Sequence, residues 1–239
     1  MTPLPKFTIS ELDLDRLQGH EGQIVILVQE DGRMDAVGRR INKATKGALA
    51  RFLESKGFDD LESGKVMTLS YPTGLMARAV SVVKINRNSA QGEVRSCGVE
   101  ITKASVCERF VIAFGKFKRI SDLIEGMALR NYEYLDQKSD AAPKPFDVEV
   151  MGPDALEQQA KIETTLAVLE GVFFTRDLTN APANILTTSH FADQLMALSA
   201  LGLEVEVLEE AELKKLGMRT LLCVGQGSDS PSKVVVMRW

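Results

Sequence analysis

Runs of apolar residues divide the first part of the chain into strands. Short continuous apolar runs, typical of strands buried on both faces, occur at 22–32 and 109–114. Two more strands are predicted at 64–74 and 75–85, around the turn Pro72-Thr73-Gly74. Because helical patterns alternate with these strands, the sequence predicts α/β architecture.

Apolar residues spaced three or four apart predict the helices of the same region. One helix is expected over 35–58, ending near Gly57, and another over 120–135, with Ser121 as its N-cap. The segment 87–105 stays open between helix and loop, because its glycines weaken a helix that its spacing only half supports.

A polar stretch with two prolines, 136–147, is the most linker-like part of the chain. A last strand is predicted at 148–153, followed by a helix over 154–178 with Asp154 as N-cap. A helix of roughly 20 residues spans about 30 Å, which is long enough to bridge two domains. We therefore expect a domain boundary near residue 150.

The remaining residues predict a second α/β segment. A helix is expected from Thr188 or Ser189, as N-cap, to a stop at Gly202. Further elements are predicted as follows: strand 203–208, helix 209–217, and strands 220–227 and 233–239. The valine-rich last strand is typical of a sheet centre, where helices and neighbouring strands normally surround it. Because the chain stops there, we expect the second domain to be incomplete.

Composition narrows the class of protein. The chain has 239 residues, 44% apolar and 26% charged, as in an ordinary soluble globular protein of one large or two modest domains. A net charge of -4 and a pI near 5.4 disfavour a chain-wide nucleic-acid surface but leave room for a local basic patch. No signal-peptide pattern or membrane-length apolar run occurs, so neither export nor membrane insertion is expected.

The cysteines and histidines do not form a recognisable site. Cys97, Cys107 and Cys223 are odd in number and irregularly spaced, which favours the reducing cytoplasm over disulfides or a metal site. Cys223 lies in an apolar strand pattern, where a buried, inert thiol is expected. His20 and His190 stand apart from other metal-ligand types, so surface or capping roles are expected for both.

Other candidate motifs have simpler structural explanations. The segment "GQGSDSPS", 225–232, follows a predicted strand but lacks the Lys-Ser or Lys-Thr pair of a phosphate loop, so a connection between strands is favoured. The adjacent pairs Glu209-Glu210 and Asp59-Asp60 would diverge on a helix and are expected to be solvated charges.

Three segments in order carry a family resemblance. The segment "TRDLTNAPANILTTSHFADQL", 175–195, resembles the segment that opens the catalytic domain of the leucine (cytosol) aminopeptidase family. The matching residues are Arg176, Asp177, Leu178, Asn180, Pro182, Asn184, Leu186 and Thr187. "EGMALRNYEYLDQKS" before it is similar to the segment that closes the family's N-terminal domain, and 204–239 resembles the next catalytic block. Arg219 and Ser232 depart from the family pattern.

The resemblance implies a fold and an organisation. We expect a macro-domain-like mixed α/β domain over 1–150, a linker helix over 151–175, and the first βα units of a metallopeptidase α/β domain over 176–239. The intact family proteins are expected to be cytoplasmic hexamers that use two divalent metals, zinc, manganese or magnesium, to release N-terminal residues from peptides. Paired metals polarise the scissile carbonyl and activate a bridging water.

The resemblance assigns no catalytic, metal-binding or substrate-binding residue to this chain, because the family's functional blocks follow the segments matched here. Asn180 and Asn184 are expected to satisfy backbone groups in the turn around Pro182. The segment is thus expected to be inactive alone, without a cofactor of its own.

Two other functions are weighed against this one. The chain could be a non-catalytic binding or assembly module derived from an aminopeptidase N-terminal domain. A nucleotide or ADP-ribose-type ligand is disfavoured, because no glycine-rich phosphate-binding loop follows a strand in the first 150 residues.

Overall fold

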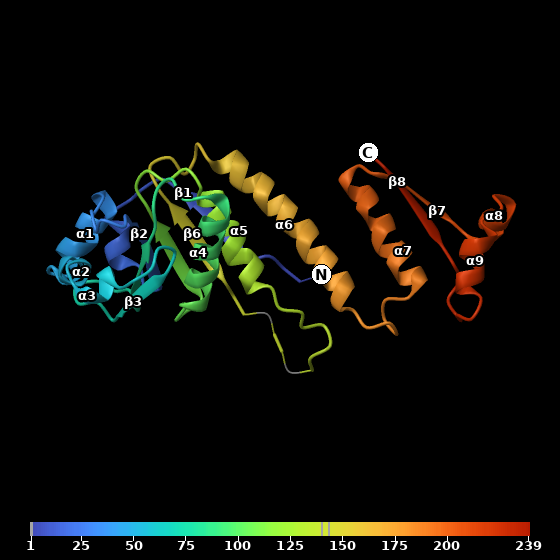
Figure 1. The fold of residues 1–239 in the computed structure, drawn as a ribbon, viewed down its shortest axis with the longest axis horizontal. Helices are drawn as coiled ribbons and strands as arrows, with labels where there is room; N and C mark the ends of the chain where they lie inside the picture. Colours follow the sequence, from blue (N-terminus) through green and yellow to red (C-terminus); the bar gives the residue numbers. More distant parts are fainter. Residues whose placement is uncertain (1, 140, 143) are drawn as a thin grey trace. The chain divides into compact units, whose positions relative to one another are not determined.

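The computed structural model describes residues 2–139, 141–142 and 144–239. The chain forms two compact units, Met1–Phe173 and Phe174–Trp239 (Figure 1). None of the helices in the described residues combines the length and the apolar content that a membrane span needs.

The first unit contains a six-stranded, mostly parallel sheet. Its strands are β1 (Lys6–Ser10), β2 (Gln23–Val28), β3 (Val66–Ser70), β4 (Ala79–Lys84), β5 (Arg109–Ala113) and β6 (Asp147–Met151). The spatial order is β1-β6-β5-β2-β4-β3, and only β3 is antiparallel to its neighbour. The predicted strands at 22–32, 64–85, 109–114 and 148–153 are therefore confirmed, as is the mixed α/β class.

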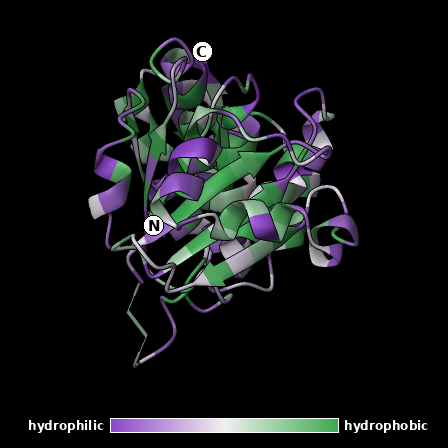
Figure 2. Ribbon diagram, turned by 90° about the vertical axis from the view of Figure 1, so that its left-hand side faces the viewer, coloured by the Kyte–Doolittle hydropathy of each residue, from purple (hydrophilic) through white to green (hydrophobic). Residues whose placement is uncertain are grey.

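Helices cover both faces of this sheet, which explains the continuous apolar runs of its central strands. On one face, Ile24 and Ile26 of β2 pack with α1 (Ala36–Ala44), α2 (Ala48–Leu53) and α3 (Lys56–Asp59). On the other face, Val25 and Leu27 pack with α4 (Gln91–Lys103), α5 (Ile120–Asn131) and part of α6 (Gln159–Asn180). Every residue of β2 and β4 is buried. Figure 2 shows the sheet mostly in hydrophobic green, behind helices with hydrophilic purple turns.

The single helix expected over 35–58 is wrong. The structure has three short helices, separated first at Lys46 and Gly47, which both adopt the left-handed conformation with φ of 52° and 84°. The Thr45 hydroxyl donates to the Ile41 carbonyl at 2.9 Å. This bond and the left-handed pair end α1, although the apolar spacing continues across the break.

The undecided segment 87–105 contains a helix, α4. It packs against α5 at two glycines: a Cβ on Gly98 would lie 2.2 Å from the Leu123 carbonyl oxygen, and one on Gly126 would lie 1.9 Å from that of Arg95. The glycines that weakened the helix prediction therefore permit a close helix crossing. Ser121 is not the N-cap of α5, because the helix begins at Ile120 after Arg119, and Ser121 is buried within its first turn.

The long helix α6 begins later than predicted. Residues 153–158 form turns, in which Asp154 accepts a backbone hydrogen bond from Gln158, and the helix begins at Gln159. Ile162, Leu169 and Phe173 form its buried face, and the Phe173 ring meets Tyr132 edge-on at 5.0 Å. The predicted linker 136–147 has no helix or strand before β6 begins at its last residue, but two of its residues, 140 and 143, lie outside the described residues.

The second unit contains a two-stranded antiparallel sheet of β7 (Glu204–Leu208) and β8 (Val234–Arg238). Its helices are α7 (Thr188–Met196), the 3-10 helix η2 (Ala197–Leu201), α8 (Glu210–Lys215) and α9 (Arg219–Gly225). Gly202 ends this helical stretch with φ of 96°, as predicted. Two predictions fail: 220–227 lies mostly in α9 rather than in a strand, and β8 has one neighbour among the described strands rather than a central position.

Candidate functional site

The two histidines lie in different units and have local roles. His20 follows the 3-10 helix η1 (Arg16–Gly19) as its C-cap, and burial lowers the pKa of its ring despite the nearby Glu149 carboxylate. His190 is exposed in the first turn of α7, where its backbone N–H donates to the Thr187 hydroxyl at 3.3 Å. Thr187 is therefore the N-cap of α7, one residue before the predicted caps.

The acidic and thiol side chains do not form a metal centre. Within residues 2–139, 141–142 and 144–239, no group of three or more His, Cys, Asp or Glu side chains could hold a metal ion. Cys97 is buried, which raises the pKa of its thiol to about 11. Cys223, expected to be buried in a strand, is instead exposed on α9. The Glu93 and Glu100 carboxylates near Cys97 also disfavour its thiolate, so Cys97 lacks the electropositive setting that activates a cysteine nucleophile.

Ligands of parallel α/β sheets commonly bind at the carboxyl ends of the strands, where adjacent crossovers diverge. Here that point lies between β2 and β5, where the Asp35 carboxylate lies against Gly115: its Oδ2 would lie 2.5 Å from a Cβ at Gly115. The other oxygen, Oδ1, accepts from the Gly38 backbone N–H at 2.8 Å and caps α1.

The helices that follow β4 and β5 at this edge also carry a carboxylate in their first turn. Glu93 accepts from the Ala90 backbone N–H at 3.0 Å at the start of α4. Asp122 at the start of α5 pairs with Arg119 and accepts from Gln91. Because acidic side chains already occupy the positive ends of these helices, the edge is a poor site for phosphate groups.

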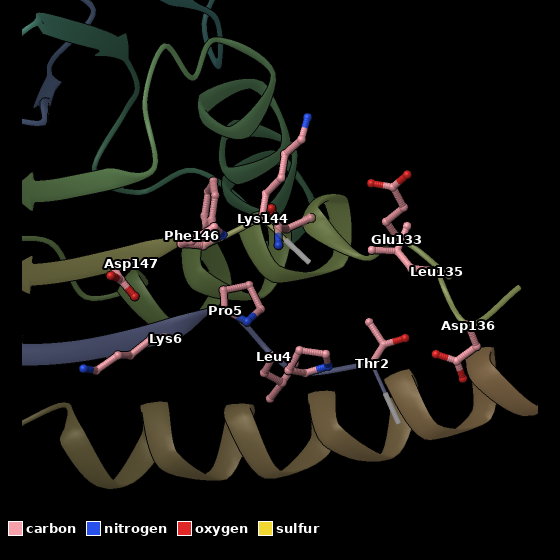
Figure 3. Close-up of a pocket in the computed structure, with 13 residues that line it drawn as sticks. Thr2, Leu4, Pro5, Lys6, Glu133, Leu135, Asp136, Lys144, Phe146 and Asp147 are labelled. Atoms are coloured by element: carbon pink, nitrogen blue, oxygen red, sulfur yellow. The ribbon is translucent and has the colours of Figure 1, made fainter. Parts of the chain in front are cut away.

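The first unit also has surface cavities. The cavity in Figure 3, of about 400 Å³, lies between residues 2–6 and the segments 131–136 and 144–147. The Lys6 and Lys144 side chains point away from each other and from Leu4. On the same rim, a hydrogen bond from Lys138 lowers the pKa of Glu133. These charges do not converge on one point, so the cavity has no evident catalytic arrangement.

Two further cavities are also without a catalytic group of residues. One of about 510 Å³ lies beside Cys97, the Lys65–Glu100 ion pair and the start of α4. The other, of about 170 Å³, lies beside His20, Arg109 and Glu149. Neither brings a nucleophile together with a base in hydrogen-bond contact.

In the second unit, the family-like segments 175–195 and 204–239 meet at the loop 225–233. The Thr188 hydroxyl at the start of α7 donates to the Pro231 carbonyl at 2.7 Å. The buried Ser232 donates its backbone N–H to Glu210 of α8 at 3.0 Å, and Lys233 pairs with Glu209. The loop thus joins the helices α7 and α8 to β8. Glu209 and Glu210 bind these local partners, whereas solvated charges were expected.

The turn between α6 and α7 is built largely by backbone hydrogen bonds. Ile185 and Leu186 both donate to the Pro182 carbonyl at 2.9 Å. Asn184 is exposed and makes no side-chain hydrogen bond in the described part of the chain, so its expected role in satisfying backbone groups is wrong. Asn180 ends α6.

The second unit is similar to part of a known enzyme family. Residues 173–239 match the model of the cytosol aminopeptidase family, catalytic domain. A probable cytosol aminopeptidase of Dinoroseobacter shibae is 44% identical over 239 residues, which are 100% of this chain and 49% of that protein. A probable cytosol aminopeptidase of Cereibacter sphaeroides is 40% identical over 95% of this chain and 46% of its own.

The chain is related to the cytosol aminopeptidase family. Because it spans about half the length of the curated relatives it matches, the comparisons are consistent with an N-terminal portion of an aminopeptidase. They do not favour a non-catalytic binding or assembly module.

Solved structures agree on the fold. A tomato leucine aminopeptidase mutant matches with a TM-score of 0.78 and 20% identity, over 99% of this chain and 51% of that chain. The bottromycin maturation enzyme BotP in complex with Mn matches with a TM-score of 0.68 and 23% identity, over 91% of this chain and 45% of its own. The family signal in the sequence came from the motif order at 125–239, which no single residue could have given.

Proposed function

We propose that this chain is the N-terminal portion of a leucyl aminopeptidase, whose intact form releases N-terminal amino acids from peptides. The observation that carries the proposal is the match of 173–239 to the family's catalytic domain, combined with 44% identity to a probable cytosol aminopeptidase along the whole chain. In this proposal, residues 1–150 form the N-terminal domain, 151–175 the linker helix, and 176–239 the beginning of the catalytic domain.

Two divalent metals, zinc or manganese, are proposed for the intact protein. When bound, such a pair supplies Lewis acidity and an activated water for peptide hydrolysis. The described residues of this chain do not fit such a centre, because they include no metal-ligand group of the required size. We propose that the metal ligands lie in the family's later blocks and that this chain is inactive alone.

Hydrolysis of a leucine anilide by the pure 239-residue chain, with manganese or zinc added, tests this proposal. No turnover above the metal-only blank is expected, whereas a longer polypeptide carrying the family's remaining blocks should hydrolyse the same substrate. Appreciable turnover by the 239-residue chain would show that the chemistry lies within it, contrary to the proposal.

We also propose a cytoplasmic homo-oligomer, a hexamer by resemblance, acting on peptides. The exposed apolar side chains of the second unit favour packing against other parts of an intact protein. Among its described residues only Ala192, Leu213 and Ser232 are buried, whereas large apolar side chains are exposed, including Phe191, Leu216 and Val224. Contiguous exposed apolar surface marks a site of association. A longer polypeptide of the family should bury these side chains, which light scattering and hydrogen exchange can test.

A further inference from the structure

An acid-free region distinguishes one part of the first unit. The chain has 33 acidic residues, yet neither 36–53 nor 63–92 contains an aspartate or glutamate. These segments form α1, α2 and the β3–β4 hairpin, and they are packed together: a Cβ on Gly74 in the hairpin turn would lie 2.1 Å from the carbonyl oxygen of Ala44, the last residue of α1. Their exposed cations form a basic surface, which is bordered by exposed Glu54 after α2 and by exposed Glu21, next to Gly22, whose carbonyl accepts from the Arg78 backbone N–H at 2.9 Å.

We name this region the basic hairpin surface. It consists of Lys43, Lys46, Arg51, Tyr71, Met76 and Arg78, all exposed. The Arg51 guanidinium donates to the backbone carbonyl of Lys46 at 3.3 Å, which places this cation against the turn between α1 and α2. None of the four cations forms an ion pair with a carboxylate in the part of the chain that the structure describes. Their charge is thus available to an anionic partner.

The backbone of this surface is strained at two positions. Lys46, with φ of 52°, and Tyr71, with φ of 48°, are the non-glycine residues with left-handed φ among those described. This conformation is costly for residues with a Cβ, and such outliers gather at functional positions. Both lie beside the contact between Gly74 and Ala44, so the strain is concentrated on one surface.

The exposed hairpin also presents two large apolar side chains. Tyr71 is 81% exposed and Met76 is 65% exposed. Attraction to the C-terminal end of α1 accounts for Lys43 in its last turn. Arg51 lies likewise in the last turn of α2. Helix ends do not account for Lys46, for Arg78 or for the exposed Tyr71 and Met76.

We propose that the basic hairpin surface binds the anionic surface of a phospholipid bilayer. Lysine and arginine are attracted to anionic lipid headgroups, and a tyrosine with an adjacent apolar side chain partitions into the interfacial layer. Single-stranded nucleic acid is usually held in a groove that tracks its backbone. A bilayer engages the exposed Tyr71 and Met76 as well as the cations, so the composition of this surface fits an anionic bilayer better. The proposal is independent of the aminopeptidase assignment.

Vesicle sedimentation of the full 239-residue chain tests the charge component. The chain should sediment with phosphatidylcholine vesicles that contain phosphatidylserine, and not with phosphatidylcholine alone. The double variant Lys43→Gln/Lys46→Gln should lower the partition coefficient roughly 20- to 30-fold, since each cation near an anionic bilayer contributes about fivefold. The matched control Lys116→Gln/Lys118→Gln removes the same charge from the loop after β5, at the carboxyl ends of the parallel strands. This control should change the partition coefficient by less than about twofold.

A fluorescence reporter tests the apolar component. Trp239 is the single tryptophan, so Tyr71→Trp in a Trp239→Phe background places the only indole on the hairpin. Its emission should shift to the blue with the anionic vesicles and remain unchanged with phosphatidylcholine alone. Circular dichroism confirms that each variant is folded.

Three results would overturn the proposal. The first is the absence of binding that depends on anionic lipid. The second is an equal loss of vesicle binding in Lys43→Gln/Lys46→Gln and in Lys116→Gln/Lys118→Gln, which would show that only the net charge of the chain matters. The third is saturable binding of a single-stranded oligonucleotide that Lys43→Gln/Lys46→Gln abolishes, without vesicle binding, which would assign the surface to nucleic acid.

Discussion

The close crossing of α4 and α5 makes Gly126→Ala the sharpest test of the packing of the first unit. A Cβ at Gly126 would lie 1.9 Å from the Arg95 carbonyl oxygen and 2.8 Å from its carbonyl carbon. Both are backbone atoms, so no flexible side chain can move aside. Because ordinary contact begins at 3.4 Å, the helices would have to separate by about 1.5 Å.

The magnitude follows from two opposing effects. Overpacking of a close-packed core costs about 1–3 kcal/mol, and separation also loosens Leu123, Met127 and Cys97, which are fully buried. Alanine in place of glycine in a helix returns about 0.5–1 kcal/mol. Gly126→Ala should therefore lower the free energy of unfolding by about 2 kcal/mol.

Urea unfolding, followed by far-ultraviolet circular dichroism, measures this change, and hydrogen exchange of α4 and α5 amides locates it. Gly92→Ala is the matched control, because Gly92 lies in α4 with nothing within 4 Å of a Cβ. That variant should be neutral or more stable. The reasoning is refuted if Gly126→Ala matches Gly92→Ala in stability and exchange.

Three further predictions concern His20, the three thiols of the chain and Tyr71. Burial holds the pKa of His20 below its ordinary 6.5, so the unfolded chain binds the proton at a higher pH than the folded chain does. The free energy of unfolding should therefore fall as the pH drops below about 6.5 through the folded pKa. Urea titrations of His20→Gln should lack that loss. Native thiol titration with a disulfide reagent should modify exposed Cys223 fastest and Cys107 more slowly, while Cys97, with its pKa near 11, should react only in denaturant; rapid native labelling of all three would contradict the burial. Tyr71→Gly should raise the free energy of unfolding by about 1 kcal/mol, because glycine adopts left-handed φ without steric cost, and an unchanged or lower urea midpoint would argue against strain at this position.

The residues that identify the family in this sequence do not themselves form a chemical site, for a physical reason. The residues that carried the family resemblance, such as Pro182 and Thr187, build a turn and a helix cap through local bonds. Local bonds of this kind leave a recognisable sequence pattern without performing a reaction. A candidate site could therefore not be assigned to particular residues, although the family could be recognised from the order of the motifs.

The sequence alone determined the features that depend on local pattern. Continuous apolar runs predicted β2, β4 and β5, because a strand covered on both faces needs apolar residues at every position. Gly202 predicted the end of a helix, since few other residues adopt its left-handed backbone.

Only the tertiary structure decided features that depend on distant partners. The short apolar run in α9 fits a strand or a helix equally well by itself, and its state depends on what surrounds it. Gly98 lowers the intrinsic helix propensity of α4, yet it permits contact with α5, a gain that no local window of sequence contains. The basic hairpin surface likewise exists because α1 and the hairpin, distant in sequence, are brought together at Ala44 and Gly74.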